Sequence, residues 1–106
     1  MTLSLMTERR WNEFFNRLEG PEGCDFKEEP NPDDPAHDPK ITWRCKGGMD
    51  KTYAKAILEK MRVANAWDVL HHVEMLGGHC DCEILMNAVE RVYEDIDREL
   101  AVGGVR

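Results

Sequence analysis

All five prolines of this chain fall within one acidic segment, residues 20–40. Repeated proline removes backbone donors and excludes a regular helix, and the many carboxylates favour contact with solvent. We therefore predict that residues 20–40 form a loop. A chain of 106 residues has the usual length of one domain, about 100–150 residues, so we expect this loop to lie within a single domain, residues 1–106.

Outside the proline-rich loop, apolar residues recur at helical spacing in four stretches. These stretches are residues 7–19, with Trp11, Phe14, Phe15 and Leu18; residues 50–61, with Ala54, Ile57, Leu58 and Met61; residues 66–76, with Ala66, Val69, Leu70, Val73 and Leu76; and residues 81–100, with Leu85, Val89, Val92 and Ile96. Thr7, Asp50 and Asn65 can cap the first three helices. The glycines at 20 and at 77–78 are typical helix stops.

Residues 41–45 differ from these stretches because they are β-branched and aromatic with rough alternation, which is typical of a short strand. The sequence thus predicts a mainly α fold, a small domain of about four helices with a short β strand or hairpin near residues 41–45. We also expect Trp11, Trp43 and Trp67 to share the core, since an exposed tryptophan would indicate an interface.

The charge of the chain excludes several classes of function. Acidic residues outnumber basic ones by 21 to 14, and the net charge of −7 argues against binding to nucleic acid or to an anionic membrane surface. No apolar run approaches the roughly 18 residues that span a bilayer. The first residues are too short for the apolar core of a secretory signal, so we expect a cytoplasmic protein with reduced cysteines.

The most chemically specific feature is the run Cys80-Asp81-Cys82, which lies between a glycine pair and the start of the last predicted helix. Thiolate sulfurs bind soft and borderline metal ions, and two of them one residue apart can chelate the same ion. A helix N-terminus also favours the thiolate, so we expect the pKa of these cysteines to be lowered. A disulfide closing so short a ring would be strained.

A closed structural zinc site needs four ligands. The sequence offers Cys45 and Cys24 to complete a site with Cys80 and Cys82. His37, His72 and His79 are possible substitutes. Of the adjacent pair His71 and His72, the second lies closer to the apolar edge of its predicted helix. The competing interpretation is that the paired cysteines are small buried thiols at a tight helix junction.

Residues 77–87, Gly-Gly-His-Cys-Asp-Cys-Glu-Ile-Leu-Met-Asn, resemble the uncharacterised bacterial domain-of-unknown-function family 2695, which carries the motif GG-x-CDCE-[IV]-L-x-N. The resemblance covers roughly residues 43–92 and includes an earlier cysteine followed by a helix, here Cys45. It implies one family-typical constellation, made of Cys45, Cys80, Cys82, Glu83 and Asn87. The resemblance implies no reaction, and Cys24 lies outside it.

Two classes of function follow from these features. The first is a non-enzymatic domain, stabilised by a structural zinc, that acts through contacts with a protein partner of basic charge. The alternative is a thiol-based redox or nucleophilic enzyme that uses Cys80 or Cys82, with His79 or His72 as the base. The sequence motifs of zinc proteases, of P-loop nucleotide-binding proteins, of serine hydrolases and of zinc deaminases are all absent.

Overall fold

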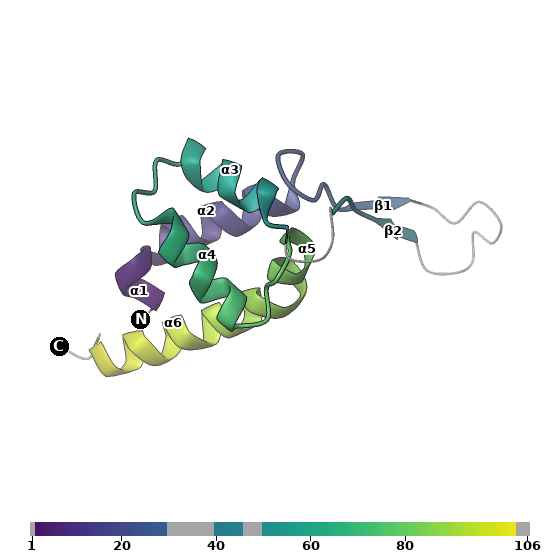
Figure 1. The fold of residues 1–106 in the computed structure, drawn as a ribbon. Coiled ribbons are helices and arrows are strands. Elements are labelled where there is room, and N and C mark those ends of the chain that lie inside the picture. Colours follow the sequence, from purple (N-terminus) through teal and green to yellow (C-terminus); the bar gives the residue numbers. More distant parts are fainter. Residues whose placement is uncertain (1, 30–39, 46–49, 104–106) are drawn as a thin grey trace.

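The computed structural model describes residues 2–29, 40–45 and 50–103. These residues form a helical body from which a two-stranded hairpin projects (Figure 1). The elements are α1 (Thr2–Leu5), α2 (Glu8–Glu19), β1 (Lys27–Glu29), β2 (Lys40–Thr42), α3 (Thr52–Lys60), α4 (Ala66–Met75), α5 (Asp81–Glu83), the π-helix η1 (Ile84–Ala88) and α6 (Val89–Gly103). This confirms the predicted mainly α fold with a short hairpin.

Helix α2 provides the aromatic part of the core. Its buried residues follow the predicted spacing of three and four, and they are Trp11, Phe14, Phe15 and Leu18. As predicted, the Thr7 hydroxyl caps the helix by accepting the backbone N–H of Arg10 at 3.3 Å. The backbone N–H of Gly20 closes the other end by donating to the carbonyls of Asn16 and Arg17. Local sequence therefore specifies this helix at both ends.

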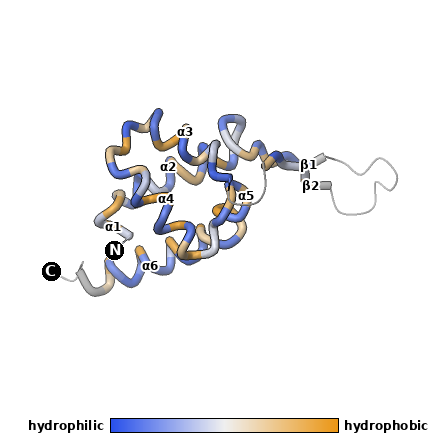
Figure 2. The backbone as a smooth tube through the Cα atoms, in the orientation of Figure 1, coloured by the Kyte–Doolittle hydropathy of each residue, from blue (hydrophilic) through white to orange (hydrophobic). Residues whose placement is uncertain are grey.

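The remaining helices pack around α2 and around one another. Helix α3 packs on α2 and α4, η1 packs on α2 and α4, and α1 packs on α4 and α6. Along the longer helices, hydrophobic residues recur between hydrophilic ones (Figure 2). The buried residues contributed by these helices include Ala54, Ile57, Leu58, Val69, Leu70, Val73, Ile84, Ala88, Val92 and Ile96. Among the described helices, none is long and apolar enough to cross a bilayer.

The last helical region differs from its prediction as a single helix over residues 81–100. The structure divides it into α5, η1 and α6. A π turn contains one residue more between its hydrogen-bonded ends than an α-helical turn does. The predicted apolar face included Leu85 and Val89, yet both are only half-buried. Their preceding neighbours Ile84 and Ala88 are fully buried instead. A regular period of 3.6 residues cannot anticipate this shift, because it assumes an uninterrupted α-helix.

The prediction of a loop over residues 20–40 is wrong in part, because a strand of the hairpin lies within it. Strand β1 lies within residues 20–40 and pairs antiparallel with β2, with Lys27 opposite Thr42 and Glu29 opposite Lys40. The pairing is possible because β1 ends immediately before the first proline of the dense run, at Pro30. The predicted strand over residues 41–45 accordingly begins one residue earlier and ends at Thr42.

Only one of the three tryptophans occupies the core. Trp11 has no exposed surface, whereas Trp43 is 46% exposed and Trp67 is 70% exposed. Trp43 follows β2 and stacks on Phe26 with 5.5 Å between ring centroids. Trp67 lies in the first turn of α4, away from the buried face of that helix, with the Lys55 ammonium 4.6 Å from its ring centroid. The prediction that all three share the core is wrong because it ignored where each element faces.

Candidate metal centre

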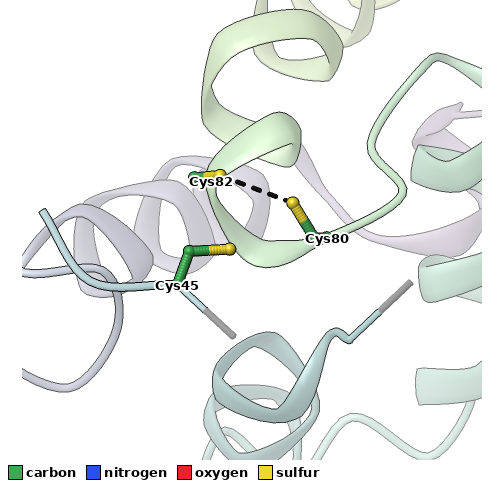
Figure 3. A group of neighbouring side chains, drawn as sticks. All are labelled: Cys45, Cys80 and Cys82. Carbon is green, nitrogen blue, oxygen red and sulfur yellow. Dashed lines mark hydrogen bonds between the residues drawn. The ribbon is translucent and has the colours of Figure 1, made fainter. Parts of the chain in front are cut away.

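Three of the four cysteines meet at one point of the fold. The sulfurs of Cys45, Cys80 and Cys82 all lie within 4.8 Å of one another, and those of Cys80 and Cys82 are 3.4 Å apart. Figure 3 shows the three side chains directed toward a common point, Cys45 from the segment after β2 and the other two from the start of α5. Cys80 is buried and the other two are half-buried. The cluster therefore joins two segments that helices α3 and α4 separate in sequence.

Asp81, between the paired cysteines, has a role that the sequence did not reveal. It is fully buried, and its carboxylate accepts the backbone N–H groups of Tyr53 at 3.2 Å and Ala54 at 2.8 Å. These amides belong to the first turn of α3, where the structure gives Lys51 no side-chain capping bond. The Asp81 N–H in turn donates to the carbonyl of Asp50 at 3.2 Å. Asp81 thus caps α3 from another helix and fixes the backbone between the two thiols.

The predicted local caps of α3 and α4 need correction in this light. Asp50 accepts the N–H of Thr52 at 2.8 Å, but the deeper amides of α3 go to Asp81. Asn65 stands at the start of α4 without a capping bond, and its side chain donates to the carbonyl of Leu5 at 3.0 Å. At α4 a tertiary contact replaces the predicted local cap, whereas at α3 the bonds from Asp81 add to the local bond made by Asp50.

The glycine pair and Asn87 hold the other side of the motif. Gly77 has a φ of +98°, and its carbonyl accepts the side-chain amide of Asn87 at 3.1 Å. The Gly78 N–H donates to the carbonyl of Val73 at 2.8 Å, and a Cβ on Gly78 would lie 2.8 Å from Cγ1 of Ile84. A Cβ at Gly78 would therefore force Ile84 or its surroundings to shift, and the positive φ of Gly77 favours glycine at that position.

Arg44 fixes Cys45 from the other direction. Its backbone N–H donates to the carbonyl of Cys24 at 2.7 Å, and its Nε donates to the carbonyl of Gly23 at 2.7 Å. Its guanidinium lies 4.9 Å from the ring centroid of Tyr53 in α3. The sequence contained no signal for this role, since a single arginine beside a strand is usually a surface residue.

The expected lowering of the thiol pKa values is wrong. Burial raises the pKa of Cys80 and outweighs the opposing effect of the Glu83 backbone amide. Burial also raises the pKa of Cys82 to about 12, and the neighbouring sulfurs of Cys45 and Cys80 add to this rise. The favourable effect of the helix N-terminus is smaller than the cost of removing a thiolate from water. In the metal-free chain both thiols are therefore protonated at neutral pH.

The structure does not place the fourth predicted cysteine with the other three. Cys24 is described, but it lies outside the group whose sulfurs are within 4.8 Å of one another. It follows α2 and is fully buried in the hydrophobic core, where burial raises the pKa of its thiol to about 12. Of the substitute histidines, His37 lies outside the described residues. His79 is 47% exposed, and its Nδ1 is 3.9 Å from Glu74.

His72 also lies away from the cysteine cluster. Its Nε2 is 2.8 Å from the hydroxyl of Thr2 in α1, and its ring centroid is 6.2 Å from that of Trp11. As predicted, it is more buried than His71, which is exposed. Thr2 connects this group to α6, since its hydroxyl donates to Asp95 at 3.4 Å and its N–H donates to Glu99 at 3.0 Å. His72 therefore fastens α1 to the helical body.

The position of His72 predicts a loss of stability in mild acid. Burial lowers the pKa of His72 and outweighs the opposing carboxylates of Asp95 and Glu99. Because its folded pKa is below its unfolded value, its contribution is complete above about pH 6.5 and is lost as the pH falls. We expect protonation of His72 to lower the free energy of unfolding by at most about 2 kcal/mol at pH 5. Urea unfolding at pH 7 and pH 5 should show a smaller pH dependence in His72→Gln, with His71→Gln as the control. An equal pH dependence in all three proteins would contradict this expectation.

Comparison with known proteins confirms the resemblance seen in the sequence. Residues 44–87 match the model of a family described as a protein of unknown function, DUF2695. The match spans less than half of the chain but contains all three clustered cysteines. The chain matches no curated protein and no solved structure. The family carries no assigned function.

Proposed function

We propose that this protein is a non-enzymatic structural domain in which Cys45, Cys80 and Cys82 bind one zinc ion. The observation that carries the proposal is the meeting of three sulfurs within 4.8 Å. Thiolates are the preferred ligands of structural zinc, and sulfur-rich tetrahedral sites select zinc or iron–sulfur clusters. The metal would bind the thiolate form and so offset the cost of burying these three groups together.

The location of the cluster supports a structural role. An ion held there would join the segment after the hairpin to the start of α5, in addition to the bonds made by Asp81 and Arg44. A metal that bridges segments far apart in sequence stabilises the folded state, because the unfolded chain offers no preformed site. Binding energy at this point would therefore appear as folding energy.

Metal analysis tests the proposal directly. The full chain, purified without a chelator or a histidine tag, is expected to contain about one zinc per chain by elemental analysis. Cys82→Ser should lower the zinc content severalfold and also lower the Tm, since binding and folding are coupled. Cys24→Ala provides the matched control: it removes a buried cysteine outside the cluster, so it should retain zinc even where it loses stability. A Cys82→Ser protein with unchanged zinc content and Tm would refute the proposal.

The enzymatic alternative makes a different prediction. A nucleophilic cysteine should react with iodoacetamide at neutral pH much faster than an ordinary thiol. The raised pKa values of Cys80 and Cys82 favour slow alkylation of the metal-free protein. Rapid alkylation of one of them would instead support the enzyme. Contact with a basic protein partner and a cytoplasmic location stay predictions from the sequence.

A further inference from the structure

Three sulfurs fill three of the four positions of a tetrahedral zinc site, so a fourth donor is needed to close it. Among the described side chains near the cluster, Glu83 is well placed. Its Oε1 accepts the thiol of Cys80 at 3.6 Å. The two residues are three apart at the start of α5, a spacing that brings side chains together on one side of a helix.

Three other residues could offer a donor atom, and each is less suited to the fourth position. The carboxylate of Asp81 accepts two amides of α3, and turning it toward the metal would leave both without a partner. The imidazole of His79 is 47% exposed and lies beside Glu74. The thiol of Cys24 is in the hydrophobic core and outside the group of three. Of the four candidates, Glu83 is the one whose donor atom contacts a sulfur of the cluster.

Two separations measured from the Cys80 sulfur are close to those of a tetrahedral site. With Zn–S bonds of about 2.3 Å and a Zn–O bond of about 2.1 Å, a tetrahedron has edges of about 3.8 Å between sulfurs and about 3.6 Å between sulfur and oxygen. The Cys80–Cys82 sulfur separation of 3.4 Å and the Cys80–Glu83 separation of 3.6 Å are close to these values. Glu83 is not within 4.8 Å of all three sulfurs, so its carboxylate must turn about its own side-chain bonds to face them.

We infer that Glu83 supplies the fourth ligand of the metal ion held by Cys45, Cys80 and Cys82. This inference rests on the proposed function. It assigns the last residue of the Cys80-Asp81-Cys82-Glu83 run to metal binding, and it defines the site as three thiolates and one carboxylate. Such a site is closed, and it leaves no open position for a substrate or a catalytic water.

X-ray absorption at the zinc edge tests the ligand set, because Zn–S and Zn–O bonds differ measurably in length. The zinc-loaded full chain is expected to show three sulfurs and one lighter atom. Glu83→Cys should convert this to four sulfurs, since a thiol at position 83 would then occupy the fourth position. Glu83→Gln should weaken zinc binding at least tenfold in a competition with a chromophoric chelator. Glu90→Gln, an exposed change of the same kind on α6, should leave the affinity unchanged.

The possible outcomes distinguish a failure of the Glu83 assignment from a failure of the proposed zinc site. Three sulfurs in a folded Glu83→Cys protein would overturn the role of Glu83 while leaving the cysteine site intact. Four sulfurs in the wild-type protein would also overturn it, and would direct attention to Cys24. A wild-type chain that binds no zinc would overturn both. Circular dichroism of each variant establishes that the compared proteins share the helical fold.

Discussion

Replacing Asp81 with alanine is expected to lower the free energy of unfolding by about 2–4 kcal/mol, because it leaves two amides of α3 without an acceptor. In a domain of this size that loss corresponds to a decrease in Tm of about 10 °C or more. The effect should reach the metal site as well. Asp81 fixes the backbone between Cys80 and Cys82, and removal of such a supporting residue typically weakens metal affinity by about 10–100-fold.

Thermal unfolding and zinc competition on Asp81→Ala provide both measurements. Asp81→Asn should be intermediate in stability, since its side-chain carbonyl still accepts one of the two amides. Asp97→Asn is the matched control, because it removes one negative charge from an exposed position on α6. If Asp81→Ala unfolds at the wild-type temperature, Asp81 does not cap α3 in solution.

The change Gly78→Ala is expected to lower the stability by about 1–3 kcal/mol and to weaken zinc binding in parallel. The added Cβ would lie 2.8 Å from Cγ1 of Ile84 and 3.0 Å from the carbonyl oxygen of Val73. Neither atom can move freely, because Ile84 is fully buried and Val73 is in α4. The chain must therefore shift where it approaches Cys80.

Gly20→Ala supplies the comparison. A Cβ at that position would meet its nearest atom, the carbonyl oxygen of Asn16, at 3.4 Å, and the backbone φ of −86° suits any residue. We expect this variant to unfold within about 1 kcal/mol of the wild-type protein and to bind zinc normally. Equal losses in the two glycine variants would show that the close approach at Gly78 is not what limits the substitution.

The sequence predicted the elements whose specification is local. Helix α2 begins and ends as expected, because its cap, its apolar face and its stop all lie within the same fourteen residues, Thr7–Gly20. The stop at residues 77–78 is also a local property, since Gly77 has a positive φ. Strand β1 was missed because three residues rich in charge become a strand only through pairing with β2. The π turn was missed because periodicity assumes a regular helix.

The candidate metal site likewise depends partly on local sequence and partly on tertiary contacts. Short-range glycine and capping signals predicted that Cys80 and Cys82 lie at the junction of two helices. The sequence had already grouped Cys45 with them, and the folded structure brings its sulfur within 4.8 Å of theirs. The burial of Cys24 in the core and the capping of α3 by Asp81 follow from the folded structure alone. Each of these depends on contacts between segments far apart in the chain. Such contacts form when helices pack, and packing is set by the shape and burial of whole faces, which residue spacing does not encode.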